Sequence, residues 1–435
     1  EHPALVDKLE DVISGVNITF RYNATFVHED AAIRAAWQEC YDADADGPEM
    51  TCLVTGKKCA AERVHPAIKG VAGAQSSGAA LVSFNSEAFC SFGREQNLNA
   101  PTSKYAAFAY TSALNHLLAD REHVGRIGDT TVLLWAKGGQ SAYQSCAMAS
   151  LFGNLPENYT TADLQKMMLD LLEGKPVEFE EELIAPETPF YVLGLAPNAA
   201  RLSVRFFLKN SFGQFMESIH EHYKRLEIIR PEYDKFETIP LWRLLDETVN
   251  QNSRDKSPAP GLSGETLRAI LNNTPYPATL LNGVTSRIRA ERNVTKGRAA
   301  IIKAYYLKNP HSDIPKEVLT VSLNPDSTNI PYNLGRLFSV LEDIQTVANP
   351  RINATIKDKY FNSASATPSR VFPVLVNLAQ KHLKKLPKDR AIYLNKQLSK
   401  IEEKLGEAYP DRLNLPQQGS FQLGYYHQTQ ARYTK

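Results

Sequence analysis

Residues 65–101 hold the side chains and backbone in this sequence that are best suited to binding a ligand. Glycines stand at positions 70, 73 and 78, and glycine lets backbone amides approach a ligand closely and adopt positive φ. Successive amides in such a turn form a concavity that binds anions. The polar candidates in and after this loop are Lys69, Gln75, Ser76, Ser77, Asn85, Asn97 and Asn99.

Lysine, amide and hydroxyl groups with few carboxylates nearby suit a phosphate backbone or the edges of bases. We therefore predict that this loop contacts nucleic acid. The alternative interpretation is a Gly/Ser surface loop that leads into a strand at residues 81–84.

The strongest electrostatic signal lies at residues 286–308, where seven Lys and Arg residues face the single acid Glu291. Tyr305 and Tyr306 add flat rings. Arginine with aromatic rings is typical of single-stranded nucleic acid binding, by phosphate pairing and base stacking. The phosphate-binding candidates in this run are Arg287, Arg289, Arg292, Lys296 and Arg298. The alternative is an exposed basic helix whose tyrosines lie in the core.

Residues 190–208 read as two strands joined by a Pro-Asn turn. Arg201 and Arg205 are four residues apart, so in a strand they share one face. We expect both to contact phosphate, and they are candidates to lie beside the basic run.

The sequence motifs of known metal sites and active sites fit this chain poorly. Cys52, Cys59 and His65, with Cys40 as a fourth ligand, are weak zinc candidates because the gap between the two cysteines is wider than usual. Reduced thiols are the alternative.

The acidic stretch at 42–47 begins like a calcium loop, but Leu53 stands where a bidentate Glu is needed. The loop at 73–79 lacks the glycine of a nucleophile elbow and the lysine of a P-loop. We predict a binding protein rather than an enzyme, with no cofactor.

Hydrophobic periodicity predicts an α+β protein: a mixed N-terminal α/β body with β-hairpin segments, followed by a C-terminal antiparallel helical bundle. We expect strands at 16–23, 50–56, 81–84 and 130–136, and helices at 29–42 and 103–120, the latter capped by Ser103 or Thr102. The predicted domains are 1–155, 156–315 and 316–435.

The C-terminal segment carries the charge asymmetry of the chain. Residues 331–435 contain 16 Lys+Arg against 8 Asp+Glu, although the net charge of the 435-residue chain is +1. A basic module on a mildly acidic body fits a protein that holds a polyanion, and a solvated bundle that happens to be basic is the alternative. Apolar stripes predict its helices, at Leu334, Leu337, Phe338, Leu341 and Ile344, and at Leu394, Leu398, Ile401 and Leu405.

Composition favours a cytoplasmic location for the protein. No run of 18 apolar residues is long enough to cross a membrane. The first residues are acidic, which argues against a secretory signal. Five cysteines without disulfide-like spacing favour a reducing compartment. The chain does not begin with Met, so we expect that residues precede it.

Several sequence blocks resemble the large subunit of the subtype I-C CRISPR Cascade complex. They include CLVTG, HPAIKGVAGAQSSGAALVSFN, GREQNLNAP, YTSALNHLL, RIGDTTVLLWA, FYVLGLAPNAARLSVRFF, SLNPDSTNIPYNLGRLFSVLE and GSFQLGYYHQTQARYTK. The resemblance runs along nearly the whole chain. Members of that family extend further at the amino end, which matches the expectation that an amino-terminal part is missing here.

The resemblance implies a non-catalytic subunit of a crRNA-guided antiviral surveillance complex in the cytoplasm of a prokaryote. Such a subunit senses the protospacer-adjacent motif (PAM), binds the target and displaced DNA strands of the R-loop, and supports recruitment of a separate helicase-nuclease. The implied partners are crRNA, target double-stranded DNA, the displaced single strand, and the backbone, handle-binding and small subunits, with no membrane.

The C-terminal bundle resembles the small subunit of such complexes, with a boundary near residues 318–322. We expect residues 319–435 to fold on their own. The competing hypothesis for the whole chain is a DNA-acting nuclease or a nucleotide-dependent enzyme with an unrecognised active site.

Overall fold

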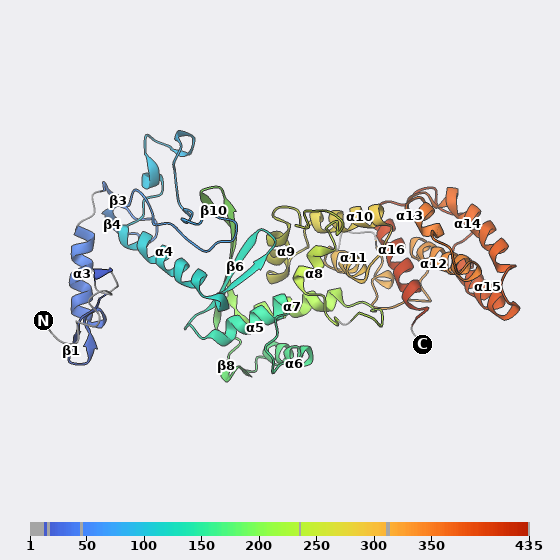
Figure 1. Ribbon diagram of the computed structural model, residues 1–435, viewed down its shortest axis with the longest axis horizontal. Helices are drawn as coiled ribbons and strands as arrows, with labels where there is room; N and C mark the ends of the chain where they lie inside the picture. Colours follow the sequence, from blue (N-terminus) through green and yellow to red (C-terminus); the bar gives the residue numbers. More distant parts are fainter. Residues whose placement is uncertain (1–12, 15–17, 44–46, 235, 310–313, 434–435) are drawn as a thin grey trace. The chain divides into compact units, whose positions relative to one another are not determined.

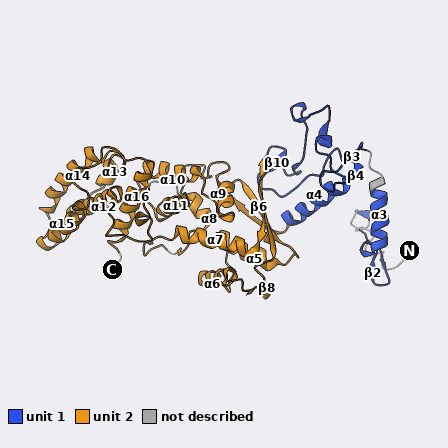
Figure 2. Cartoon of the chain, turned by 180° about the vertical axis from the view of Figure 1, so that it is seen from behind, with its two compact units in different colours: residues 1–119, 198–202 blue, residues 120–197, 203–435 orange. Residues whose placement is uncertain are grey.

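The computed structural model describes residues 13–14, 18–43, 47–234, 236–309 and 314–433. They form two compact units, shown in different colours in Figure 2. Unit 1 comprises residues 1–119 with 198–202, and unit 2 comprises residues 120–197 with 203–435. The boundaries predicted near residues 155 and 315 separate parts that we expect to fold independently. The division into two units does not test independent folding, so these boundaries stay predictions.

Unit 1 consists, in its described residues, of helices, short antiparallel strand pairs and long loops. The strand β1 pairs with β2, and β3 pairs with β4. Its elements are β1 (Arg21–Tyr22), β2 (Thr25–Phe26), η1 (Val27–Glu29), α3 (Ala31–Ala43), β3 (Glu49–Thr51), β4 (Lys58–Ala60), η2 (Glu87–Phe89), η3 (Gln96–Asn99) and α4 (Lys104–Ala119).

The helix α4 confirms the helix predicted at 103–120 and its cap. The Ser103 hydroxyl accepts a hydrogen bond from the Ala106 N–H at 3.1 Å, which satisfies one of the donors that a helix start leaves open. In the described residues the predicted strands of this unit are shorter than expected: β1 covers residues 21–22 of the strand predicted at 16–23, and β3, at residues 49–51, overlaps only the start of the strand predicted at 50–56. The strand predicted at 81–84 is wrong: a single bridge forms at Ala80, and no ladder continues from it.

Unit 2 contains the larger sheet and the C-terminal helices (Figure 1). Residues 198–202, at the tip of the β9–β10 hairpin, belong to unit 1. Its elements are η4 (Arg121–His123), β5 (Val124–Ile127), β6 (Thr130–Ala136), α5 (Ser141–Phe152), α6 (Thr161–Leu172), β7 (Val177–Phe179), β8 (Glu182–Ile184), β9 (Pro189–Asn198), β10 (Arg201–Ser211), α7 (Phe212–Leu226), α8 (Leu241–Asp246), α9 (Leu262–Leu271), α10 (Ala278–Glu291), α11 (Lys296–Lys308), η5 (Lys316–Val318), α12 (Ile330–Ala348), α13 (Ile356–Ala366), α14 (Pro368–Leu383), α15 (Lys388–Glu402) and α16 (Leu415–Gln430).

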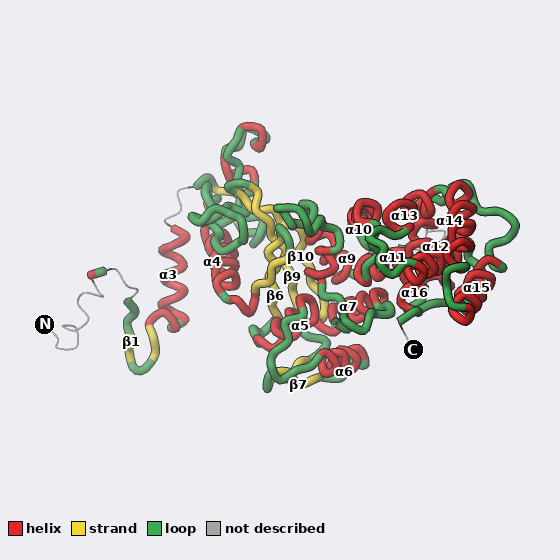
Figure 3. Tube along the Cα trace, turned by 45° about the vertical axis from the view of Figure 1, so that its right-hand side comes forward, coloured by secondary structure: helices red, strands yellow, loops and turns green. Residues whose placement is uncertain are grey.

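The sheet has the strand order β10-β9-β6-β5, and its middle strands lie side by side in Figure 3. The strand β6 matches the predicted strand at 130–136, and it runs antiparallel to β5 and to β9. Leu134 and Val192 lie opposite each other and belong to the apolar core of the unit. Trp135 lies opposite Tyr191, and the alternation of side chains along a strand puts this pair on the other face.

The two strands predicted at 190–208 are confirmed, but the position of their turn is wrong. The strand β9 continues through Pro197 and Asn198, and the chain reverses at Ala199, where φ is 53°. The pairing of β9 with β6 ends at Leu195. Pro197 therefore lies beyond the ladder with β6, which suits a residue that cannot donate a ladder hydrogen bond.

The C-terminal helices form a bundle around α12 and α16. The predicted apolar stripe of α12 is confirmed, since Leu334, Leu337 and Phe338 are fully buried. Glycines allow α12 and α16 to approach backbone to backbone: a Cβ on Gly335 would lie 1.9 Å from the Phe421 carbonyl oxygen. The α+β class is thereby confirmed, with small antiparallel sheets followed by helices.

The bundle shares its core with the helices before it. One apolar cluster runs from Ile127 on β5 to Tyr426 on α16. A Cβ on Gly419 would lie 2.9 Å from the Tyr306 ring, so α16 also packs against α11. None of the helices in the described part of the chain is long and apolar enough to span a membrane.

Candidate nucleic-acid interface

The glycine-rich loop in unit 1 is closed at its base by a pair of backbone hydrogen bonds. Ile68 and Ala79 exchange N–H···O bonds of 2.9 and 2.8 Å. The side chain of Asn115, on α4, accepts from the Lys69 N–H at 2.7 Å and donates to the Ala67 carbonyl at 3.1 Å. Residues 69–78 thus form a closed loop that is anchored to a helix.

The glycines of this loop have the conformations that the sequence predicts. Gly70, Gly73 and Gly78 have φ of 90°, 81° and 103°. A Cβ on Gly78 would also lie 2.8 Å from the Ala67 Cβ. No other residue fits position 78 without strain, because both the backbone angle and the space exclude a side chain.

The predicted ligand-binding side chains of the loop point to solvent. Lys69, Gln75, Ser76, Ser77 and Asn85 are all exposed. Among the described residues, the structure gives the side chains of Gln75, Ser76 and Ser77 no hydrogen-bond partner. They are available to a ligand, and their binding role stays a prediction.

Asn97 and Asn99 have a different environment. Asn97 is buried at 3% exposure. The Asn99 side chain accepts from the Ser91 N–H at 2.8 Å and donates to the carbonyls of Arg94 and Gln96 at 3.0 and 2.9 Å. These contacts give Asn99 a structural role, in holding the 91–99 segment together. We therefore leave both residues out of the proposed interface.

Arg201 is the basic residue that the fold brings next to this loop. It forms a parallel bridge with Ala80, two residues after Gly78, and Leu202 N–H donates to the Ala80 carbonyl at 2.9 Å. The Arg201 guanidinium lies 4.3 Å from the centre of the Phe89 ring, within the range of a cation–π interaction. Loop amides, Lys69 and Arg201 together make a positive surface in unit 1.

Arg205 does not share this environment, although it lies on the same strand. Its guanidinium donates to Asp129 at 3.0 Å, and Asp129 also accepts from the Gly261 N–H at 3.2 Å. Both charged side chains remain about one third exposed. Arg205 is therefore partly neutralised, and its predicted contact with phosphate stays a prediction.

The basic run at 286–308 is divided between the surface and the interior. Arg289 and Arg292 are exposed around the C-terminal end of α10. Arg287 is partly exposed and lies 3.7 Å from Glu291. The Arg289 guanidinium donates to the Gln418 side chain of α16 at 3.0 Å. This end of α10 is a basic surface beside the C-terminal bundle.

Three of the four remaining cations of the run are buried in α11, and Lys308 at the end of this helix is partly exposed. Lys296, Arg298 and Lys303 are 8%, 3% and 2% exposed. The helix also carries Ala299, Ala300, Ile301 and Ile302, all buried. Four consecutive apolar residues point to all sides of a helix, so this part of α11 is enclosed by its neighbours. The basic residues next to these four positions are therefore buried as well.

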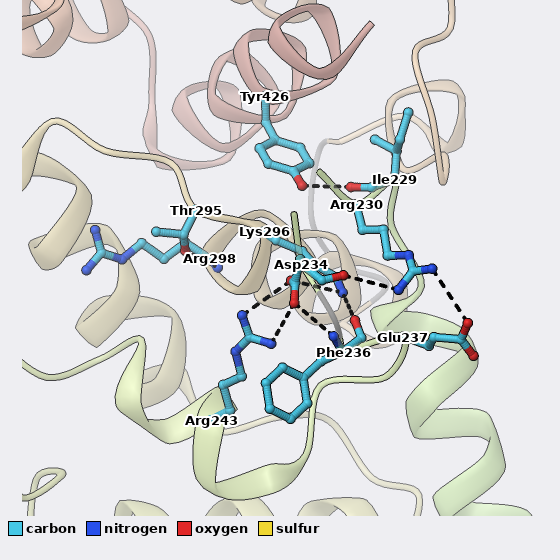
Figure 4. A network of polar contacts seen from close by, with 10 residues as sticks. All are labelled: Ile229, Arg230, Asp234, Phe236, Glu237, Arg243, Thr295, Lys296, Arg298 and Tyr426. Atoms are coloured by element: carbon cyan, nitrogen blue, oxygen red, sulfur yellow. Dashed lines mark hydrogen bonds and ion pairs between the residues drawn. The ribbon is translucent and has the colours of Figure 1, made fainter. Parts of the chain in front are cut away.

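Lys296 belongs to a polar network centred on Asp234, shown in Figure 4. Its ammonium group lies 3.3 Å from Asp234, which also accepts two hydrogen bonds from Arg243, of 3.0 and 3.3 Å. Burial works to raise the pKa of Asp234, but the hydrogen bonds from Arg243 and from the Phe236 N–H, with the charge of Lys296, lower it below its ordinary value. This lysine neutralises a buried carboxylate and is not available to phosphate.

Arg298 is held in the same way by two glutamates. It lies 3.3 Å from Glu247 and 2.6 Å from Glu291. Tyr306 is buried, and Tyr305 packs edge-on against it at 5.3 Å between ring centres. We therefore do not assign phosphate binding to Lys296 and Arg298, because both are ion-paired inside the fold.

The weak zinc candidates form separate hydrogen-bonded environments. The Cys52 sulfur accepts from the N–H groups of Ser103 and Thr55 at 3.3 and 3.4 Å. The His65 Nδ1 lies 2.7 Å from the Tyr110 hydroxyl. Within the described residues, no three His, Cys, Asp or Glu side chains gather in a way that could hold a metal ion. Asp44 and Asp46, from the acidic stretch, lie outside the described residues.

The C-terminal bundle carries a cluster of lysines that were not among the binding residues predicted from the sequence. Lys381, Lys384, Lys385 and Lys388 surround the turn between α14 and α15, and all four are exposed. In the described part of the chain, none of them forms an ion pair. The signal was present as a Lys-rich run at 381–388, which is typical of nucleic-acid-binding patches.

The geometry of the described residues thus offers positive surfaces with loop amides and hydroxyls. Comparison with known protein families matches residues 1–433 to the CRISPR-associated protein family Cas_Csd1. No curated protein matches the chain. The family match agrees with the sequence blocks that resemble a type I-C Cascade large subunit. Because the match extends over nearly all 435 residues, the chain belongs to the Cas_Csd1 family of CRISPR-associated proteins.

Proposed function

We propose that this chain is the large subunit of a type I-C Cascade complex, and that it binds nucleic acid without catalysing a reaction. The observation that carries the proposal is the family match from residue 1 to residue 433. In this role the subunit senses the protospacer-adjacent motif, helps to open the duplex, binds the target and displaced strands, and supports docking of a separate helicase-nuclease.

The exposed chemistry of the chain suits this role. In RNA-guided complexes, base pairing with the guide reads the sequence, while the protein reads a short motif and the DNA backbone. Such a protein needs cations, amides and hydroxyls on its surface. The loop at 69–78 offers these groups together with Arg201 in unit 1.

We assign the loop to motif or crRNA-handle recognition and the basic surfaces of unit 2 to DNA phosphates. The phosphate-binding set is narrower than the sequence predicted. It comprises Arg287, Arg289 and Arg292 at the end of α10, joined by the lysine cluster at 381–388. The C-terminal bundle, which resembles a Cascade small subunit, carries that cluster on its surface.

The proposal is tested by the salt dependence of DNA binding in the assembled complex. The variant Arg289→Glu/Arg292→Glu should flatten the slope of log affinity against log salt by about one unit per lost phosphate contact. The matched control is Lys166→Glu/Arg254→Glu, which makes the same change of charge at exposed positions of α6 and of the segment before α9. The control should leave the slope unchanged.

An unchanged slope in the Arg289→Glu/Arg292→Glu complex, with normal assembly, would contradict the phosphate assignment. A second measurement separates binding from catalysis. The purified chain, incubated with labelled DNA and a divalent metal ion, should cut nothing. Cleavage by the chain alone would instead support the competing hypothesis of a nuclease.

A further inference from the structure

Three aromatic rings from three neighbouring strands lie together on one face of the unit 2 sheet. Trp135 on β6 stacks on Tyr191 of β9, with 5.3 Å between ring centres and 9° between ring planes. Phe207 on β10 lies 6.2 Å from Trp135 and 6.3 Å from Tyr191, at 29° and 19°. We call these three residues the ring cluster.

The ring cluster lies on the face of the sheet away from the apolar core. Leu134, Val192 and Phe206, each next in sequence to a cluster residue, are buried in that core. Phe207 is 56% exposed, and Trp135 and Tyr191 are partly exposed. In the described part of the chain, none of the three rings is among the side chains that pack against the core. Packing in the main core therefore does not explain the three rings, although Leu133 and Leu193, two residues away on the same face, are buried.

The surroundings of the ring cluster are basic. Within unit 2 the strands of the sheet carry Arg126, Arg205 and Lys209 and contain no Asp or Glu, although Arg205 is paired with Asp129 next to β6. The Lys209 ammonium group lies 5.8 Å from the centre of the Tyr191 ring. Lys209 is exposed and, within the described residues, forms no ion pair. A partner for this face must combine flat apolar groups with negative charge.

We propose that the ring cluster, with Lys209, is a stacking platform for the bases of a DNA single strand. Aromatic side chains on a sheet stack on unpaired bases, while nearby cations hold the phosphates. A duplex cannot use such a platform, because its bases are already stacked inside the helix. This inference rests on the proposed function, and it adds a site that takes unpaired bases.

Of the nucleic acids in the complex, the displaced DNA strand is the one that we expect to bind to the ring cluster. Every base has a π-face, so stacking tolerates any sequence. The displaced strand differs in sequence from one target to the next, whereas the handle of a crRNA is constant and suits recognition by hydrogen bonds. A platform of rings without a convergent set of donors fits the strand of variable sequence.

The test compares two substitutions of the exposed ring, Phe207→Leu and Phe207→Tyr. Leucine keeps the apolar surface and loses the π-face, and tyrosine keeps both. For random-sequence single-stranded DNA, Phe207→Leu should weaken binding by the full chain about 5- to 100-fold, which corresponds to the loss of one stacked base. Phe207→Tyr should stay within about 2-fold of the parent, the level that separates a retained stack from a lost one.

The salt slope distinguishes this site from the phosphate contacts proposed above. Phe207→Leu removes no charge, so the affinity should fall while the slope of log affinity against log salt stays the same. The control is Tyr233→Leu, which removes another exposed ring of unit 2, 86% exposed, and should bind like the parent chain. A single-stranded RNA of matched sequence tests the source: a loss of RNA binding in Phe207→Leu without a loss of DNA binding would assign the rings to RNA.

Crosslinking in the assembled complex locates the strand. A displaced strand that carries 5-iododeoxyuridine should crosslink, on irradiation, to Trp135, Tyr191 or Phe207, as identified by mass spectrometry. The proposal is overturned if Phe207→Leu binds single-stranded DNA like the parent chain. It is also overturned if only RNA binding falls, or if assembly is lost while binding to DNA is unchanged, which would make the cluster a protein-docking surface.

Discussion

Lys296 and Asp234 form an ion pair of 3.3 Å in which both side chains are buried, at 7% and 5% exposure. Lys296 begins α11, and Asp234 lies in the segment that connects α7 to α8. The Tyr426 hydroxyl of α16 donates to the Ile229 carbonyl of the same segment at 2.7 Å. The network in Figure 4 therefore joins this connecting segment to two helices that are distant in sequence.

Asp234→Asn should destabilise unit 2. The change leaves the buried Lys296 and the partly exposed Arg243 without their counter-charge, and breaking a buried pair in this way costs about 3–5 kcal/mol. Thermal unfolding followed by circular dichroism should show a clearly lower midpoint. Glu237→Gln is the control, because Arg230 and Glu237 form an ion pair whose side chains are 43% and 63% exposed, and such exposed pairs contribute about 0–1 kcal/mol. Equal midpoints for the two variants would show that the network adds no stability.

Lys303→Met should not destabilise the protein at pH 7. Burial lowers the pKa of Lys303 to about 8, and the charge of Glu227 opposes this only partly. The ammonium form thus costs about 3 kcal/mol in the folded state, which methionine avoids. Between pH 8 and the ordinary lysine value, the unfolded chain binds more protons than the folded one, so the stability of the parent protein rises with pH.

The stability advantage of Lys303→Met should therefore narrow between pH 8 and pH 10. Denaturant unfolding at pH 7 and pH 9.5 measures it, with the exposed Lys166→Met as the control. A Lys303→Met protein that is strongly destabilised at pH 7 would mean that the ammonium group has a favourable partner in the fold.

Buried histidines should make the protein sensitive to acid. Burial, helped by the charge of Arg225, lowers the pKa of His222 to about 3, and burial with the charge of Lys303 lowers that of His427 to about 4. As the pH falls below about 6.5, the unfolded chain gains protons that the folded chain does not accept. Each histidine then removes about 1.4 kcal/mol of stability per pH unit, down to its folded pKa.

The variant His222→Gln should flatten this loss between pH 6.5 and pH 4. Its unfolding free energy, measured across that window, should change less steeply than that of the parent, by about 1.4 kcal/mol per pH unit. His28→Gln is the control, because the side chain of His28 is exposed. Parallel curves for His222→Gln and the parent would mean that His222 accepts a proton in the folded protein.

The loop prediction concerns recognition rather than stability. Gln75→Ala/Ser77→Ala should leave the fold intact, because both side chains are exposed. If they read base edges, binding of DNA with the cognate motif by the assembled complex should weaken by about 1–3 kcal/mol, and binding of random DNA should change less. Equal losses on both DNAs would leave the loop only a backbone-positioning role.

Gly78→Ala provides the structural contrast in the same loop. The new Cβ would collide with Ala67 at 2.8 Å, at a φ of 103°. We expect both stability and DNA binding to fall. Gly56→Ala is the matched control, because Gly56 also has positive φ but a Cβ there meets nothing within 4 Å.

The local sequence pattern was sufficient to predict the elements whose structure depends on residues that are neighbours in the chain. The strand at 130–136, the helix after Ser103 and the buried stripe of α12 were predicted correctly. Each depends on alternation, capping or helical spacing, which are properties of neighbouring residues. The sequence blocks were also specific enough to indicate the family.

Tertiary structure alone decided which charged side chains reach solvent. Arg292 and Arg298 are six residues apart and looked equivalent, yet one is exposed and the other is paired with Glu247 and Glu291 in the interior. The difference arises because α11 is enclosed by other helices, among them α16, which the chain reaches more than a hundred residues later. Charge composition cannot reveal that enclosure, because burial depends on what packs against a residue.

The ring cluster could not be predicted from the sequence either. Trp135, Tyr191 and Phe207 come from three separate segments, and each reads in the sequence as an ordinary strand residue. Strand order and register bring them onto one face. The sequence determined the elements, the family and the overall balance of charge, whereas the long-range pairing of strands and packing of helices determined which groups form a surface that a ligand can reach.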